Sequence, residues 1–249
     1  MRNALVILLG AALLGAGATG CGSPVPEPGV APAPGDGLVV RLTSLPGLGP
    51  VTGSATSTPA YALYGDGRLI ENRSVAARID ADLVLTRVSR HTVRDLLRAA
   101  TKALLLPEAQ QRRLGAGVLD ITVLTTGGRF GRQVAGVGPV AADLLGTFAS
   151  AVAPGRDRYE PTAVAVIGFP AGSAAGPAGT WPLTGMRRAA FGPGGVGWCA
   201  LLLGADLDRV RAVAGAQSGF SVWSVDGERF SVVFRPLLPD DTDCGSLTR

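Results

Sequence analysis

Histidine, lysine and aromatic residues are scarce in this sequence, and their scarcity excludes several kinds of chemistry. The 249 residues include one histidine, His91, and one lysine, Lys102, and aromatic side chains make up 5%. A single histidine cannot build a histidine-rich metal site, and alanine stands three residues before Lys102, where a serine–lysine enzyme has its serine. The G-x-S-x-G elbow, the P-loop and a G-x-G-x-x-G turn between strand and helix are also missing. We therefore assign no catalytic residue, no metal site and no cofactor.

Charge is also sparse. Charged residues make up 17% of the chain, the net charge is +4, and all but one of the 23 basic residues are arginine. The arginines stand singly or in pairs such as Arg187 and Arg188, which is typical of a solvated surface. Such weak and scattered charge excludes nucleic acid as a partner. His91, between Arg90 and Thr92 at the start of an expected helix, is interpreted as an exposed side chain.

The N-terminus carries an export signal. Met1–Asn3 is a short positive region, and the apolar run Ala4–Gly17 ends in small residues. This run is too short to span a membrane, which takes about 20 residues. The stretch from Ala18 to Cys21 resembles the bacterial lipobox, so residues 1–20 are predicted to be removed and Cys21 to be lipidated. Ala18 stands where leucine is usual, and cleavage near Cys21 without lipidation is the alternative.

A tether follows the predicted lipid anchor. Gly22–Gly37 alternates proline with small residues and has no periodic apolar face, so residues 21–37 are expected to stay extended. At about 3.1 Å per residue, these residues could hold a folded domain up to about 50 Å from the membrane. The sequence thus predicts a chain anchored by lipid on the extracytoplasmic face of the cell membrane.

Three cysteines divide by role. With Cys21 lipidated, Cys199 and Cys244 remain, and in an oxidising compartment two remaining cysteines are expected to form a disulfide bond. Their spacing matches neither a zinc site nor a C-x-x-C redox motif. The bond requires their Cα atoms to lie about 4.4 to 6.8 Å apart.

Glycine-containing turns predict β-hairpins at three places. Asp226-Gly227 separates two alternating runs, and Gly65–Gly67 and Gly127-Gly128 do the same earlier in the chain. The nearly continuous apolar run Thr162–Phe169 predicts a strand buried on both faces. Pro170–Gly197, rich in glycine, proline and alanine, is interpreted as a long irregular loop.

Three amphipathic helices complete the expected fold. Helical spacing of apolar residues follows Ser89, runs from Ala141 to Val152, and resumes after Asp206, where Leu207, Val210, Val213 and Ala214 are expected to face the core. The fold class is therefore α+β, an antiparallel sheet of glycine-turned hairpins with about three packed helices. The order strand, helix, hairpin occurs at 83–137 and again at 198–237. Two related units and a chance match of amphipathic patterns both explain this repetition.

The domain organisation follows from these elements. Residues 38–155 form an N-terminal α+β half and residues 156–249 a C-terminal α+β half, and the two halves are expected to pack as one unit.

Aspartates gather near the C-terminus. Asp240, Asp241 and Asp243 could bind a hard cation through oxygen ligands, but the spacing of an EF-hand and its distal glutamate are missing, so no metal is assigned. Paired carboxylates in a cleft would instead support a hydrolase. Asp240, Asp241 and Glu160 are the candidates for that activity.

Several short strings resemble a known group of proteins. These are the segment from Leu63 to Arg68, the YEPTAVAV string beginning at Tyr159, Trp181-Pro182, and the FRPLLPD string ending at Asp240. Over most of its mature length the chain is similar to uncharacterised actinobacterial envelope lipoproteins. The resemblance implies a location and a fold, and it transfers no activity, ligand or catalytic residue.

The sequence favours a membrane-anchored extracytoplasmic lipoprotein that binds an envelope protein or another ligand without catalysis. Tyr61, Tyr64 and Trp181 are the aromatic residues expected on its binding surface. The alternative from a different class is the envelope hydrolase acting through acidic residues.

Overall fold

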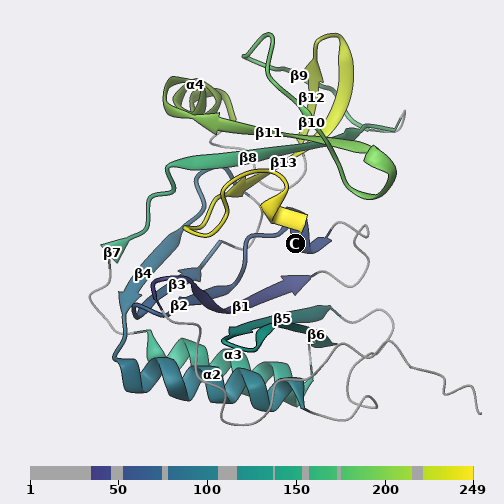
Figure 1. Cartoon of the computed structure of the whole chain (residues 1–249). Coiled ribbons are helices and arrows are strands. Elements are labelled where there is room, and N and C mark those ends of the chain that lie inside the picture. The colour runs from purple at the N-terminus through teal and green to yellow at the C-terminus, as the bar shows by residue number, and fades with distance from the viewer. Residues whose placement is uncertain are drawn as a thin grey trace, which may run out of the picture.

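The chain folds into two β-sheets with helices on their outer faces, as the α+β prediction requires (Figure 1). The computed structural model describes residues 35–45, 53–74, 78–105, 117–136, 138–152, 157–172, 175–214 and 221–248. Cys21, the predicted signal and nearly all of the predicted tether lie outside the described residues. Among those described, no helix is both long enough and apolar enough to cross a membrane.

Three helices match the predicted ones, and a single turn, α1 (Gly53–Thr56), precedes them. They are α2 (Arg90–Leu104), α3 (Pro139–Ala151) and α4 (Gly204–Ala214). Ser89 caps α2, since its hydroxyl accepts a hydrogen bond from the backbone N–H of Thr92 over 3.1 Å. Val213 of α4 is 50% exposed, so the prediction that it faces the core is wrong.

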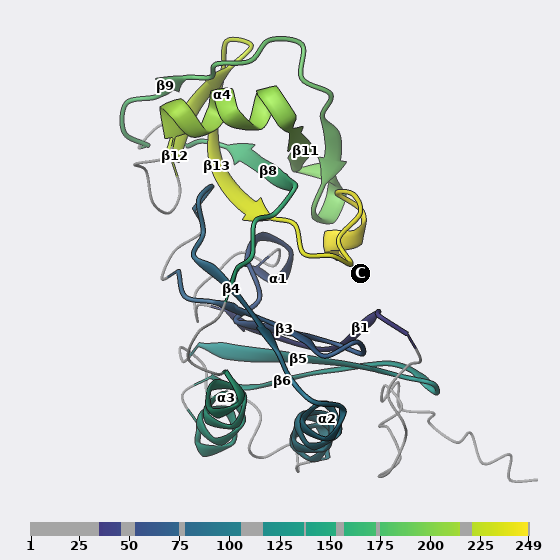
Figure 2. The same ribbon diagram turned by 90° about the vertical axis from the view of Figure 1, so that its left-hand side faces the viewer.

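The first sheet is antiparallel and has the strand order β6-β5-β1-β2-β3-β4-β7. Its strands are β1 (Leu38–Leu45), β2 (Tyr61–Tyr64), β3 (Arg68–Asn72), β4 (Leu83–Arg87), β5 (Val118–Thr125), β6 (Gly128–Ala135) and β7 (Asp157–Arg158). The helices α2 and α3 cover one face of this sheet (Figure 2). Leu96 of α2 and Phe148 of α3 share a core with Leu42 of β1.

The second sheet has the order β10-β11-β8-β13-β12-β9 and is mixed, because β12 runs parallel to β9. Its strands are β8 (Ala163–Pro170), β9 (Gly179–Thr180), β10 (Ala189–Phe191), β11 (Gly197–Leu203), β12 (Ser221–Val225) and β13 (Glu228–Pro236). Six of the eight residues of β8 are buried, which confirms the strand predicted to be buried on both faces. The expected irregular loop, 170–197, contains β9, β10 and the short helix η2 (Pro193–Gly195).

The Asp226-Gly227 turn has the backbone conformation predicted for it. The φ angle is 51° at Asp226 and 85° at Gly227. Among the described residues, Asp226 is the only non-glycine residue with a positive φ angle. Two consecutive positive φ angles match the twist of the flanking strands β12 and β13, which pair from Val225↔Glu228 outward.

The two strand–helix–hairpin units differ in their arrangement. In the first sheet three strands separate β4 from the hairpin β5–β6, and the first hairpin strand, β5, lies inward. In the second sheet only β8 separates β11 from the hairpin β12–β13, and the second hairpin strand, β13, lies inward. The sheet order therefore favours the interpretation that the amphipathic patterns match by chance, and it does not favour two related units.

Between the sheets lies a layer formed by α1 and the C-terminal segment with its short helix η3 (Ser246–Thr248) (Figures 1 and 2). Ala55 of α1 and Leu247 of η3 pack with Ile167 of β8. Leu238 packs with Tyr64 on the first sheet. The hydrophobic cores between the two sheets are thus formed by residues from both halves of the chain.

Candidate functional site

The three aromatic residues expected on a binding surface are buried. Tyr61 is 8% exposed, Tyr64 1% and Trp181 5%. Tyr61 packs against Phe148 in the first core, and Trp181 packs edge-on against Trp223 in the second. We therefore correct the expectation that they form an exposed binding surface: their aromatic area is used for packing.

A buried ion-pair network joins the two sheets. Arg41 of β1 reaches Asp240 and Asp241, which follow β13, with nitrogen–oxygen distances of 2.6 and 2.9 Å. The Tyr64 hydroxyl of β2 donates to Asp240 over 2.6 Å. Arg235 of β13 lies 3.4 Å from Asp241, and both side chains are 1% exposed. Because an unpaired buried charge is strongly destabilising, this network fixes the C-terminal segment against the first sheet.

Backbone groups complete the network. Arg235 donates to the carbonyl oxygen of Ala55 over 2.6 Å, and Asp241 accepts from the N–H of Leu238 over 3.2 Å. Burial would lower the pKa of Arg41, but the two neighbouring aspartates raise this pKa above its ordinary value. Burial raises the pKa of the Tyr64 hydroxyl, and Asp240 adds to this effect. Tyr64 therefore remains a neutral hydrogen-bond donor at neutral pH.

The carboxylates proposed for a hydrolase do not meet in a cleft. Asp240 and Asp241 are adjacent, but both are bound to Arg41. Glu160 is exposed, and Asp243 accepts a hydrogen bond from the backbone N–H of Ser246 over 2.7 Å. Within the described ranges, no group of three or more His, Cys, Asp or Glu residues is placed to hold a metal ion.

Cys199 and Cys244 form the predicted disulfide bond, with Cα atoms 5.9 Å apart. Cys199 lies in β11, and Cys244 lies between β13 and η3. The bond therefore holds the C-terminal segment against β11, on the side of the second sheet that faces the first sheet. His91, expected to be exposed, is 84% exposed and lies 3.2 Å from Asp95 on α2.

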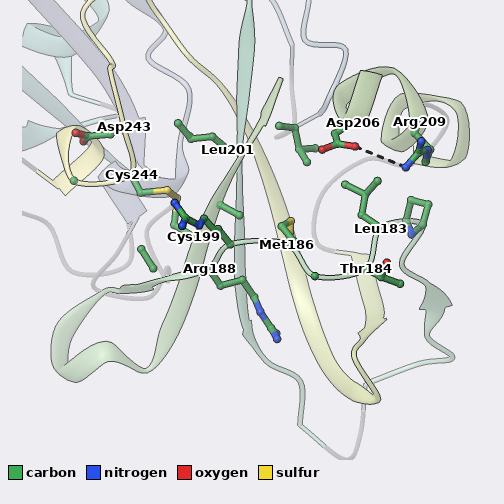
Figure 3. A pocket seen from close by; sticks show the side chains of 17 residues that line it. Leu183, Thr184, Met186, Arg188, Cys199, Leu201, Asp206, Arg209, Asp243 and Cys244 are labelled. Carbon is green, nitrogen blue, oxygen red and sulfur yellow. Dashed lines mark ion pairs between the residues drawn. A yellow bond between two sulfur atoms is a disulfide. The ribbon is translucent and has the colours of Figure 1, made fainter. Parts of the chain in front are cut away.

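A groove of about 970 Å³ lies beside β11. We call it the edge groove and define it by the segment 182–189, residues 199–202 of β11, Asp206 and Arg209 of α4, and residues 243–245. Figure 3 shows the disulfide at one end and the Asp206–Arg209 ion pair at the other. Its volume is within the range of ligand sites, about 300 to 1,000 Å³.

The edge groove exists because β10 pairs with only part of β11. The register pairs Ala189 with Cys199 and Phe191 with Gly197, so β10 covers only the first three residues of β11. The following stretch, Ala200–Leu203, pairs with β8 on its other side, down to Leu203↔Ala163. In the described part of the chain no strand pairs with Ala200–Leu203 on the groove side. The groove thus exposes an open strand edge.

Arginines give the edge groove an excess of positive charge. Its lining contains Arg187, Arg188 and Arg209 against Asp206 and Asp243. Arg188 is bound to Asp226 over 2.7 Å and Arg209 lies 3.7 Å from Asp206, both on partly exposed side chains. Arg187 has no ion pair among the residues that the structure describes. An anionic group in the groove would therefore find at least one available guanidinium.

Sequence reasoning missed this site. It interpreted the Arg187-Arg188 pair as a solvated surface and the surrounding segment as a structureless loop. One signal was present in the sequence: Ala200–Leu203 is an uninterrupted apolar stretch that follows the arginine pair after the segment 189–199. Its open edge depends on where β10 begins, which no local pattern indicates.

Comparison with known proteins finds no matching family model, curated protein or solved structure.

Proposed function

We propose that this chain is a lipid-anchored extracytoplasmic protein of an actinobacterial cell envelope that binds a partner in the edge groove without catalysing a reaction. The observation that carries the proposal is the groove itself. It combines an open strand edge with an excess of arginine over aspartate. Such a combination suits binding, because an open strand edge can pair with the backbone of an extended peptide and an arginine can bind an acidic group.

The positions of the acidic groups support a role without catalysis. A hydrolase that uses two carboxylates needs them in one cleft, about 5 to 9.5 Å apart. In the groove, Asp206 is near Arg209 and Asp243 binds the backbone of Ser246. Both aspartates thus have local partners, which leaves the groove better suited to binding than to acid–base chemistry.

The disulfide supports an oxidising location, since such bonds persist mainly outside the cytoplasm. The export signal, Cys21 and the proline-rich tether support attachment to the membrane.

Labelling with a palmitate analogue tests the anchor. The full chain, expressed in an actinobacterial host, should incorporate the label and sediment with membranes. The Cys21→Ala variant should lose the label and appear in the soluble extracytoplasmic fraction. Equal labelling of both chains would refute lipidation at Cys21.

Site-specific photocrosslinking in cells tests the binding role. A photoreactive amino acid replaces Thr184, which lines the groove and is exposed. The matched control replaces Val213, which is 50% exposed on α4 and lies outside the lining. We expect a defined envelope partner to crosslink at position 184 and not at 213. Identical products at both positions, or none at 184, would refute the groove as the binding site.

A further inference from the structure

The open edge in the groove is unusual among the sheet edges of this protein. The edge strand β6 carries Arg129 and Arg132, β7 and β9 have two residues each, and β10 has three. Charge and shortness are the usual means by which proteins prevent edge-to-edge pairing. Ala200–Leu203 has neither protection, since it is wholly apolar and belongs to the seven-residue strand β11, whose pairing with β10 stops at Cys199.

We propose that the edge groove binds an extended, acidic peptide segment of a partner protein, which pairs as an added β-strand with Ala200–Leu203. This inference rests on the proposed function and adds the class of ligand. The bound segment would continue the line of β10, because it would occupy the side of β11 that β10 leaves open beyond Cys199.

The side chains beside the edge suit a strand with alternating residues. Successive side chains of β11 point to opposite faces: Cys199 packs in the core between the sheets, and Ala200 and Leu202 pack in the outer core. A bound strand would therefore place alternate side chains toward Leu201 and the disulfide, and toward Leu183 and Met186.

The charge of the lining favours acidic side chains in the ligand. Arg187 is available in the described structure, and Arg209 is 59% exposed despite its nearby Asp206. A carboxylate on the ligand could bind Arg187 without breaking an existing ion pair. A basic ligand would place like charges beside three arginines, which is unfavourable.

Synthetic peptides test the inference on the full-length chain purified in detergent. The probes are fluorescent peptides of about seven residues that alternate valine with aspartate, with serine or with lysine. We expect the aspartate peptide to bind at least about tenfold more tightly than the lysine peptide, and binding to weaken as salt rises. Failure of the aspartate peptide to bind at about 1 mM would overturn the inference.

Two N-methylated forms of the aspartate peptide test strand pairing directly. Methyl groups on one alternate set of amides block one edge of the peptide, and methyl groups on the other set block the opposite edge. We expect one form to lose at least about tenfold in affinity and the other to bind nearly as the parent. Equal binding by both forms would overturn pairing with β11.

Substitution of arginine tests the charge. Arg187→Ala should weaken the aspartate peptide about three- to fivefold, as expected for one partly exposed ion pair. Arg94→Ala, an exposed arginine on α2, is the matched control and should leave affinity unchanged. An equal effect of the two substitutions would overturn the assigned role of Arg187.

Two further outcomes separate the inference from the proposed function. If position 184 still crosslinks to a partner in cells while no peptide binds, the peptide inference is wrong and the binding role stands. If neither is observed, both are wrong. A concentration-dependent dimer that the aspartate peptide does not dissociate would assign the edge to a second copy of the chain and overturn the inference.

Discussion

The two sheets bury their outer faces by different means. On the first sheet, the helices α2 and α3, with 15 and 13 residues, provide the cover. On the second, α4 has 11 residues, and the segment containing Trp181 and Leu183 covers the rest. A regular helix covers a sheet continuously, whereas an irregular segment follows its anchoring side chains and leaves gaps. The edge groove is such a gap, where the chain between Trp181 and β10 departs from β11.

Tyrosine and tryptophan are also distributed differently between the two halves. The three tyrosines lie in or beside the first sheet, and Trp181, Trp198 and Trp223 all lie in the outer core of the second. Their indole rings share this core with Leu207 and Val210 of α4. The comparison predicts that the second half depends on individual large side chains more than the first.

Truncation of Trp181 should have the largest effect. Trp181→Ala should lower the free energy of unfolding by about 3 to 5 kcal/mol, because it leaves a cavity between Trp223 and Phe234. Trp181→Phe should cost much less, since the buried indole N–H has no hydrogen-bond partner within the described residues. Urea unfolding at neutral pH measures both. Equal losses for the two variants would contradict the packing role.

The junction between the halves is the next most sensitive place. Asp241→Asn should lower the free energy of unfolding by about 3 kcal/mol, because both Arg41 and Arg235 lose a buried anionic partner. The neighbouring substitution, Asp240→Asn, should cost about 1 kcal/mol, since the Asp240 side chain is 25% exposed. Urea unfolding of the pair tests this order. A greater loss for Asp240→Asn would contradict the assigned roles.

Loss of the disulfide should act mainly on the second half. The double variant Cys199→Ala/Cys244→Ala should lose about 2 to 4 kcal/mol, because the bond closes a loop across 45 positions. Thiol alkylation followed by mass spectrometry checks that the wild-type chain has the bond. Reduction of the wild type should reproduce the loss. Alkylation of both thiols without reduction would contradict the pairing.

Alkaline pH should act mainly on the first half. Burial, with a further contribution from Glu71, raises the pKa of Tyr61 to about 12, and burial also raises the pKa of Tyr64 and Tyr159. Tyrosines in the unfolded chain titrate near about pH 10. Above that pH the folded chain holds more protons, so this stability is present below about pH 10 and is lost as pH rises.

Denaturant unfolding between about pH 9 and pH 12 measures the alkaline effect. Each fully shifted tyrosine contributes at most about 1.4 kcal/mol per pH unit to the slope. Tyr61→Phe should make the slope shallower by up to that amount between about pH 10 and pH 12. Tryptophan fluorescence reports the second half, and coincidence of its transition with tyrosine absorbance would show that the two halves unfold together. An unchanged slope in Tyr61→Phe would contradict the raised pKa.

Local patterns were sufficient for elements that depend on neighbouring residues. Ser89 and the helical spacing after it predicted α2, and Asp226-Gly227 predicted a turn whose two residues both have positive φ. The pairing of Cys199 with Cys244 followed from counting cysteines in a chain that the sequence predicts to be exported. Local patterns failed where burial decides the role of a side chain. Tyr61, Tyr64 and Trp181 are residue types that are common in binding surfaces, but all three are buried.

The sequence by itself determined the α+β class, the main helices, the hairpins and the disulfide, because each follows from periodicity, turn chemistry or residue type over a short distance. Only the tertiary structure decided that the strands divide into two sheets and that Asp241 joins Arg41 across 200 positions. It also decided that β10 begins only at Ala189, opposite Cys199, which leaves Ala200–Leu203 open. These features depend on contacts between distant segments, whose geometry arises when the two sheets pack and is not encoded in any local pattern.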